Sequence, residues 1–254
     1  MNTFVLSARR AAVMLACTAA LVPVAACGNA PGATDAAGTA RPSAADSRGS
    51  AVAEANGVEK LAAEEIYNNS RQANADAGSF REQMTREDAK SDLRISATEC
   101  AGTVEMSQRG SFEIIRNGND VWANLDGSLT EWVNSQFGIT LSADTWIHGT
   151  PSHPLMKGFV SWCHSEQISN PDTAGANLNP TKGKTTTVDG QEVVPVSISG
   201  KGETVTWYAA ATGKPYYLGQ DSTRDDIPDI TFSEFGEPVD AQKPAGPVQE
   251  APKE

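Results

Sequence analysis

Few side chains in this sequence have the types and the spacing that chemistry requires. His148 and His153 flank a four-residue loop, but no further ligand follows at the regular spacing of a zinc site. The run Asp225-Asp226-Ile227-Pro228-Asp229 lacks the alternating acidic ladder and the closing glutamate of a calcium loop. No nucleophile elbow, Ser-x-x-Lys motif or phosphate-binding glycine loop is present. We therefore expect no metal, no cofactor and no enzymatic activity; a hydrolase would need His148 or His153 beside a nucleophile in a pocket.

The cysteines separate into two groups around an N-terminal leader. Residues 1–26 have the pattern of a secretory signal, in which Arg9 and Arg10 precede an apolar stretch too short to span a membrane. Cys17 lies inside this leader and Cys27 directly follows it, so Cys100 and Cys163 remain in the exported part. Two cysteines in an exported domain predict a disulfide, with two free thiols as the alternative. A Cys100–Cys163 bridge would close a long loop and contribute about 4 kcal/mol to stability.

The end of the leader carries a second signal. Val24-Ala25-Ala26-Cys27 resembles the lipobox of bacterial lipoproteins, whose signal is cut before the cysteine once its thiol has been acylated. This resemblance implies that the mature chain begins at Cys27 and is anchored by diacylglycerol and palmitate chains to the outer face of the cytoplasmic membrane. An ordinary secretory signal followed by a chance cysteine is the alternative. Two or more acyl chains, at ~0.8 kcal/mol per buried methylene, anchor a protein stably.

The charge of the chain limits its partners. The 254 residues carry a formal net charge of −12, with 20 Lys and Arg against 32 Asp and Glu. Removal of Arg9 and Arg10 with the leader leaves 18 basic residues against the same 32 acidic ones, so the net charge becomes −14. So acidic a chain is a poor ligand for nucleic acid and for anionic lipid surfaces. We expect no nucleic-acid partner and attachment to the membrane through acyl chains alone.

Composition divides the mature chain into three parts. Residues 27–57 consist of the predicted lipidated cysteine and a segment of Ala, Gly, Ser, Pro and Asp, which predicts a disordered tether with a reach of about 30 Å. Residues 237–254 are acidic and rich in proline, which predicts a disordered tail. Residues 58–236 are left as one domain, of a normal size for a single core.

The domain is predicted to begin with a helix and to continue mainly as strands. Leu61 to Ala77 contains helix formers without Gly or Pro, and two short helices are expected at Ser128 to Phe137 and Pro154 to Ser165. Asn117-Gly118 predicts a hairpin turn. Further turns are expected at Asp189-Gly190, Gly200-Lys201 and Thr212-Gly213. The expected strands are Leu93–Thr98, Thr103–Gln108, Phe112–Arg116, Asp120–Leu125, Gln191–Ser199, Gly202–Ala211, Lys214–Gly219 and Ile227–Ser233.

The C-terminal hairpins share one apolar face. With two-residue loops at the expected turns, Val194 pairs with Trp207 and Val196 pairs with Val205. Independent turns then place the large apolar side chains on the same side of a meandering antiparallel sheet. We expect this face to bind a ligand through Val194, Val196, Val205, Trp207, Leu218, Ile230 and Phe232.

Scattered strand and turn patterns carry a resemblance to a known family. They are Glu64-Glu-Ile-Tyr67, Cys100-Ala-Gly-Thr-Val104, Glu113 to Trp122, Lys184 to Gly190 and Ala211 to Leu218. Together with the lipobox and the leading helix, they resemble the LppX/LprG-type mycobacterial lipoproteins, which are similar in fold to the LolA and LolB carriers. The resemblance implies an α+β fold: a curved antiparallel sheet forming a half-open β-barrel, with a leading helix, a short helical insert and a stabilising disulfide. It also implies a concave face that holds acyl chains.

Two functions follow from this interpretation. The first is a membrane-anchored extracytoplasmic lipoprotein that binds or carries a lipid or other amphiphile in an apolar concavity of the sheet. The second is an envelope scaffold or interaction lipoprotein with a filled core. A continuous apolar cavity of several hundred Å³ would favour the carrier, and a packed interior would favour the scaffold.

Overall fold

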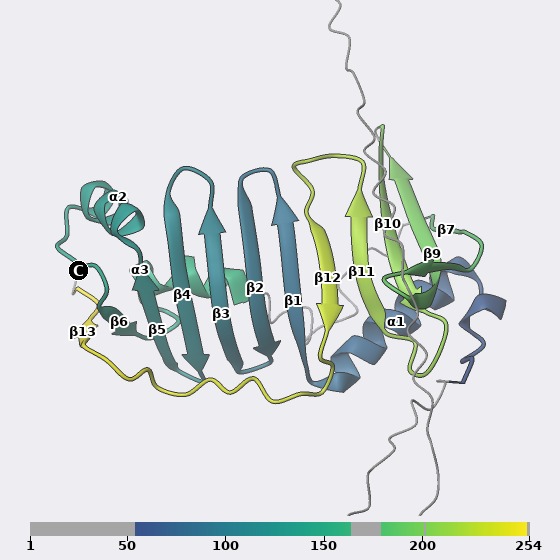
Figure 1. Cartoon of the computed structure of the whole chain (residues 1–254), viewed down its shortest axis with the longest axis horizontal. Helices are drawn as coiled ribbons and strands as arrows, with labels where there is room; N and C mark the ends of the chain where they lie inside the picture. Colours follow the sequence, from purple (N-terminus) through teal and green to yellow (C-terminus); the bar gives the residue numbers. More distant parts are fainter. Residues whose placement is uncertain (1–53, 164–178, 201, 253–254) are drawn as a thin grey trace, which may run out of the picture. The chain divides into compact units, whose positions relative to one another are not determined.

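One open sheet dominates the domain. The computed structural model describes residues 54–163, 179–200 and 202–252, all of which belong to one compact unit, Ser50–Glu254. Its strands form a 13-stranded sheet in the order β13-β6-β5-β4-β3-β2-β1-β12-β11-β10-β9-β7, with β8 paired to β9 (Figure 1). Because β13 and β7 end this order, the curved sheet is unclosed. The expected α+β class is confirmed, whereas the leader and Cys27 lie outside the described residues.

Most elements of the described chain are strands, with helices before β1 and on either side of β6. The helices are η1 (Val58–Lys60), α1 (Ala63–Ala77), α2 (Gly127–Phe137), α3 (Pro154–Val160) and η2 (Ser161–Cys163). The strands of the first half are β1 (Ser79–Arg86), β2 (Ala89–Ser96), β3 (Glu99–Met106), β4 (Gly110–Asn117), β5 (Asp120–Leu125) and β6 (Trp146–Gly149). The second half contains β7 (Thr181–Lys182), β8 (Thr186–Val188), β9 (Gln191–Gly200), β10 (Glu203–Ala210), β11 (Tyr217–Ser222), β12 (Asp229–Ser233) and β13 (Val248–Glu250).

The pairing of β9 with β10 differs from the sequence prediction by two residues. Val196 lies opposite Trp207 and Val194 lies opposite Ala209, because the loop follows Gly200, which pairs with Glu203. A shift of two residues preserves the side of the sheet on which each residue lies. Val196 and Trp207 therefore share a face, as expected.

Helix α1 packs against this face of the sheet (Figure 1). Its buried residues Ile66, Ser70 and Asn74 recur every fourth position, which is the period of a helix stripe. The Asn74 side chain fixes the helix to the sheet, since its Nδ2 donates to the Tyr217 carbonyl at 2.9 Å and its Oδ1 accepts from the Tyr217 N–H at 2.9 Å. Gly78, in the left-handed conformation, ends the helix.

The larger core lies on the part of the sheet formed by β1 to β6. Leu93, Ile95, Val104 and Ile114 are fully buried there, and α2 and α3 contribute Leu129, Val133, Met156 and Phe159 to the same cluster. Both helices of the expected insert are thus present, and they cover the β4–β5 region of the sheet. The apolar side chains of the two helices replace water over that region, which stabilises the domain through burial.

The C-terminal residues are ordered up to residue 252, which corrects the prediction of a disordered tail from residue 237. The segment runs from the end of β12 along the sheet to its far side, where β13 pairs in parallel with β6 (Figure 1). Val239 and Ala241 are buried along the way, and Asn117 Nδ2 donates to the Ala241 carbonyl at 3.0 Å. The prediction rested on proline content and charge, but backbone pairing and two small apolar anchors are enough to order an extended segment.

A histidine holds the end of this segment. His148 Nδ1 lies 3.0 Å from Glu250 Oε1 on β13, and its Nε2 lies 2.9 Å from Asp120 Oδ1 on β5. The ring also stacks on Trp122 at a centroid distance of 5.2 Å. Partial burial lowers the pKa of His148, but the two carboxylates outweigh it and raise the pKa above its usual value. Protonated His148 therefore joins β13 to β5 through two charged contacts.

Candidate functional site

The main cavity lies between the two inserted helices and the turns of two hairpins. Its volume is about 450 Å³, which is within the range of small-molecule sites. The β1–β2 and β3–β4 turns form one side, and α2, α3 and η2 form the other. The residues that line it are Arg86, Asp88, Met106, Ser107, Gln108, Arg109, Phe112, Leu129, Trp132, Val133, Phe137, Pro154, Leu155, Gly158, Phe159 and Trp162.

The interior of the cavity is aromatic and aliphatic. Phe112 of β4 packs edge-on against Phe159 of α3 at 4.9 Å between ring centroids and against Trp162 of η2 at 6.4 Å. Leu129 and Val133 of α2 complete this apolar surface. Gly158, an exposed residue of α3, lines the cavity without a side chain, and a Cβ built at this position would meet no atom within 4 Å. The lining can exclude water from an apolar chain but provides few polar partners inside.

An aspartate positions α2 over the cavity. The Asp126 carboxylate caps the helix by accepting from the Leu129 N–H at 2.8 Å, and it also accepts from the Ser111 N–H at 2.6 Å and the Ser111 hydroxyl at 2.9 Å. Gly110 permits this approach, because a Cβ at Gly110 would overlap the carboxylate. Burial raises the pKa of Asp126, but these hydrogen bonds outweigh it and hold the pKa below its usual value.

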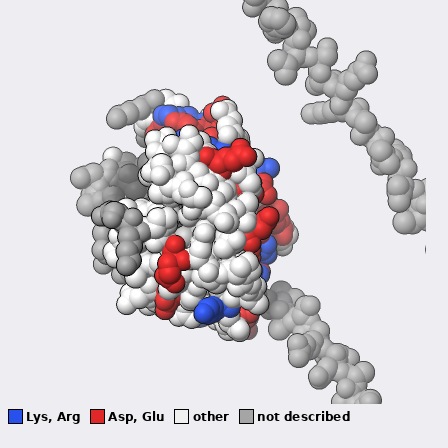
Figure 2. All heavy atoms as spheres, turned by 90° about the vertical axis from the view of Figure 1, so that its left-hand side faces the viewer, with Lys and Arg blue, Asp and Glu red and all other residues white. Residues whose placement is uncertain are grey.

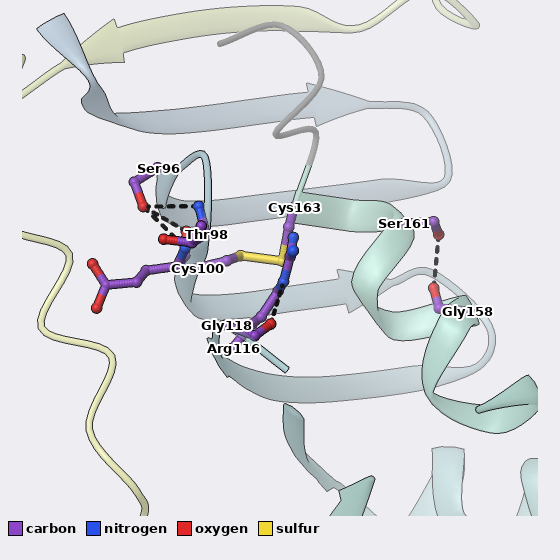
Figure 3. The surroundings of a disulfide bond; sticks show 9 residues. Ser96, Thr98, Cys100, Arg116, Gly118, Gly158, Ser161 and Cys163 are labelled. Carbon is purple, nitrogen blue, oxygen red and sulfur yellow. Dashed lines mark hydrogen bonds between the residues drawn. A yellow bond between two sulfur atoms is a disulfide. The ribbon is translucent and has the colours of Figure 1, made fainter. Parts of the chain in front are cut away.

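The disulfide positions the helical wall on the opposite side. Cys163, at the end of η2, bonds to Cys100 of β3, with 5.9 Å between the Cα atoms (Figure 3). Both cysteines are buried, and the bond joins the end of the helical insert to the sheet directly after Trp162. The predicted Cys100–Cys163 pairing is confirmed.

The charged residues that line the cavity lie at its mouth. The Arg86 guanidinium lies over the Trp162 ring at 5.5 Å, and its Nε forms an ion pair with Asp88 Oδ1 at 2.6 Å. The Arg109 guanidinium lies over the Trp132 ring at 4.9 Å. Each arginine thus covers a tryptophan from one of the two helical elements.

Two aromatic side chains of α2 are exposed beside this mouth. Trp132 retains 37% and Phe137 retains 59% of its accessible surface, and their rings contact each other edge-on at 6.4 Å. The surface at this end of the sheet is largely uncharged, with scattered acidic and basic groups (Figure 2). Contiguous exposed apolar surface is less common than single exposed apolar side chains, and these two rings extend the apolar surface of the cavity outward.

The seven residues predicted to bind a ligand do not line this cavity. Val194 and Val196 are buried under α1, where Ile66 and Tyr67 pack against them. Tyr67 also packs edge-on against Trp207 at 5.1 Å. The space left there is about 10 Å³, at the lower limit of what a single water molecule occupies. The concavity expected on this face is filled by α1.

The other predicted ligand residues have structural contacts as well. Trp207 Nε1 donates to Gln220 Oε1 at 2.9 Å, and Val205 lies opposite Ser222. Phe232 and Ile230 pack in the larger core, where the ring of Phe232 lies edge-on to that of Phe80 with 5.0 Å between the ring centroids. The pairing of β10 with β11 shifts after Tyr208, so Tyr217 lies opposite Ala209 and lines the void under α1, whereas Leu218 is not among the residues that line it.

The histidines have structural contacts in the described part of the chain. His148 holds β13, and His153 caps α3 by accepting from the Leu155 N–H at 3.2 Å. His164 lies outside the described residues. No group of three or more His, Cys, Asp or Glu among residues 54–163, 179–200 and 202–252 is arranged to hold a metal ion. In those same ranges, no helix combines the length and the apolar character needed to cross a bilayer.

Sequence reasoning missed the residues of the cavity. Phe159 and Trp162 were expected on a helix and Trp132 on another, but nothing in the sequence indicates that the two helices leave space between them. The arginines belong to separate turns, and each stacks on a tryptophan distant in the sequence. Pairs of arginine and tryptophan are a general signal of exposed stacking, but the partners can be assigned only from coordinates.

Among comparisons with known proteins, only the comparison with solved structures finds proteins similar to this chain. No protein-family model matches the chain, and no curated protein matches it. The chain is similar to lipoprotein LppX of Mycobacterium tuberculosis, with 14% identity and a TM-score of 0.41 over 70% of this chain and 100% of LppX. It is also similar to MucB in complex with MucA (13%, TM-score 0.36, 73% of this chain and 60% of MucB). A LolA superfamily protein from Nitrosomonas europaea has 10% identity and a TM-score of 0.24, over 68% of this chain and 92% of that protein. LppX and the LolA superfamily, which the sequence resembles, are thus both among the solved structures similar to this chain.

Proposed function

We propose that this protein binds an amphiphile and holds its apolar part in the cavity between α2, α3 and the sheet. The observation that carries this proposal is the cavity itself, of about 450 Å³ and lined mainly by aromatic and aliphatic side chains. An acyl chain that enters it leaves water, at ~0.8 kcal/mol for each methylene buried. The proposed action is sequestration of the apolar chain without a chemical step, and it is supported by a lining that is mainly aromatic and aliphatic.

Anchoring is the second part of the proposal. A lipidated Cys27 and the segment up to residue 57 would keep the domain near the outer face of the cytoplasmic membrane, where amphiphiles are found. The support is the leader and the Val-Ala-Ala-Cys motif. Expression of Cys27→Ser in the native host is expected to shift the protein from the membrane to the soluble fraction or the medium. Unchanged membrane association of that variant would contradict the anchor.

The filled face under α1 is the observation that favours the alternative, a scaffold lipoprotein. That half of the sheet has no room for a ligand, because α1 occupies it. The two functions therefore differ in whether a ligand must bind in the cavity, which lies over the other half of the sheet. A scaffold needs no occupancy of the cavity, whereas a carrier loses its function when the cavity is filled.

The experiment adds a side chain to the lining of the cavity at a position where it meets no neighbouring atom. Gly158→Leu adds a side chain where a Cβ meets no atom within 4 Å, and leucine is a better helix former than glycine. Gly127→Leu is the matched control, since a Cβ at this exposed first residue of α2 also meets no atom and Gly127 does not line the cavity. Binding is measured by titration with Nile red, an uncharged dye whose fluorescence reports an apolar environment, and by its displacement with dodecanol.

The expected result separates the two variants. Exclusion of two methylene groups, at ~0.8 kcal/mol each, corresponds to about tenfold weaker binding to Gly158→Leu, while Gly127→Leu binds as the unmodified protein does. Urea denaturation of all three proteins verifies that stability is maintained. No saturable binding to the unmodified protein, or equal binding to Gly158→Leu, would refute the proposed function.

A further inference from the structure

The residues at the mouth of the cavity carry a net charge opposite in sign to that of the whole chain. The chain carries 32 acidic and 20 basic residues, yet the lining of the cavity contains two arginines and one aspartate. Asp88 forms its ion pair with Arg86. Arg109 forms no ion pair with any residue in the described part of the chain, and its contact is the ring of Trp132. Among the described residues that line the mouth, the net charge is therefore one positive charge, on Arg109.

The contact of Arg109 with Trp132 leaves its hydrogen-bonding capacity available. In the described part of the chain, no side-chain hydrogen bond or ion pair joins the N–H groups of its guanidinium to another residue. These groups match the two oxygens of a carboxylate or the oxygens of a phosphate. The ring of Trp132 also restricts the position of the guanidinium, at 4.9 Å from the ring centroid, so less freedom is lost when an anion binds.

The turn that carries Arg109 is fixed at the edge of the apolar interior. Its backbone N–H donates to the Met106 carbonyl at 3.1 Å, and Met106 itself lines the cavity. A ligand with its chain between Phe112 and Leu129 would thus have its head beside Arg109, on the solvent side. This order of apolar interior and cationic rim matches a single-chain amphiphile with an anionic head.

We propose that the cavity selects amphiphiles with an anionic oxygen head, a carboxylate or a phosphate, and that Arg109 binds this head while the chain enters between α2 and α3. The inference rests on the proposed function, and it adds the class of ligand. Arg86 contributes a second cation at the same mouth, partly neutralised by Asp88. A neutral hydroxyl head can accept a hydrogen bond from Arg109, but it lacks the negative charge and the pair of oxygens that make the contact with a carboxylate or phosphate stronger.

The test compares heads on one chain length. Dodecanoate, dodecyl phosphate and dodecanol each displace Nile red from the unmodified protein, from Arg109→Gln and from Arg71→Gln, at pH 8 and below the concentrations at which the amphiphiles aggregate. Arg71 is a matched control, because its guanidinium also lies over an aromatic ring, that of Tyr67 at 5.5 Å, away from this cavity. The comparison of dodecanoate with dodecyl phosphate identifies which of the two anionic heads fits better.

The expected outcome is a loss confined to one variant and to charged ligands. Dodecanoate or dodecyl phosphate should bind Arg109→Gln about tenfold more weakly than the unmodified protein, as for one charge-assisted contact, with dodecanol within about twofold. Arg71→Gln should bind all three ligands as the unmodified protein does. Arg109→Lys, which keeps the charge but not the planar fork, should lose less than Arg109→Gln.

Two results would overturn the inference and leave the proposed function intact. One is dodecanol binding to the unmodified protein as tightly as both anions, and the other is an equal loss of anion binding in Arg71→Gln and Arg109→Gln. Failure of all three amphiphiles to displace Nile red, or an absence of Nile red binding, would instead refute the proposed function.

Discussion

The disulfide is expected to supply a large part of the stability of this domain. Cys100 and Cys163 are 63 residues apart, and a closed loop of that length lowers the entropy of the unfolded chain by an amount equivalent to about 4 kcal/mol. Total stabilities of domains are about 5–15 kcal/mol. The loop contains β4, β5, α2, β6 and α3, so it includes both helical walls of the cavity. Loss of the bond should therefore destabilise the domain and impair binding together.

The assay is urea denaturation of the unmodified protein with and without a thiol reductant, and of the double variant Cys100→Ala/Cys163→Ala. With a denaturant dependence of about 2 kcal/mol per molar urea, a loss of 4 kcal/mol lowers the midpoint by about 2 M. The reduced protein isolates the effect of the cross-link, whereas the double variant also removes two buried sulfur atoms. A midpoint that changes by less than about 0.5 M on complete reduction would refute the reasoning, because the cross-link would then contribute less than about 1 kcal/mol.

Three further changes test the contacts that hold the site and the sheet. Asp126→Ala removes the cap of α2 and should lower the free energy of unfolding by about 1 kcal/mol at pH 7 and by less at pH 3. The pKa of Asp126 is lowered in the folded protein, so its carboxylate stabilises the fold fully above the unfolded-state pKa. This stabilisation is lost as the pH falls through the folded-state pKa. In urea denaturation, His148→Gln should destabilise the protein more at pH 5 than at pH 9. The pKa of His148 is raised in the folded protein, so its stabilising effect is complete below the unfolded-state pKa. The effect is lost as the pH rises through the folded-state pKa. Gly102→Ala should lower the midpoint of thermal unfolding by several degrees, since a Cβ at this position would overlap the Asp92 carbonyl oxygen across β2 and β3.

Turn residues made the hairpins predictable, but not their register. The expected loop Asn117-Gly118 lies one residue later, between the paired residues Asn117 and Asp120, and the Gly200-Lys201 loop is displaced in the same way. A displacement of one residue in the loop changes the register by two and leaves each side chain on its expected face. The existence of strands and the direction of their side chains therefore followed from local sequence, whereas the partner of each residue depended on loop geometry.

Strand β1 shows why alternation alone is an incomplete guide. Phe80, Glu82 and Met84 point to the same buried side, and the fully buried Glu82 interrupts the apolar pattern that would have identified the strand. The tail was missed for the complementary reason, because β13 has an exposed Val248 and only three residues. In both cases, pairing with a distant strand determines the structure.

The site was the least predictable part, for a physical reason. An apolar face indicates that something covers it, but not whether the cover leaves a void. The stripe of Ile66 and Ser70 on α1 includes small side chains, which are compatible with a hole or with close packing, and the structure shows that α1 leaves almost no space. The open space lies instead between α2, α3 and the turns of two hairpins, an arrangement that only the packing reveals.

The parallel pairing of β13 with β6 has a consequence for the order in which the chain can fold. Glu250 lies 102 residues beyond His148, so nearly the whole domain must be synthesised before β6 acquires its outer neighbour. Until then, β6 presents an unsatisfied row of backbone groups that another nascent chain can occupy. A premature stop a few codons before residue 248 would make this transient vulnerability permanent, and the truncated product would be prone to edge-to-edge association despite an intact core.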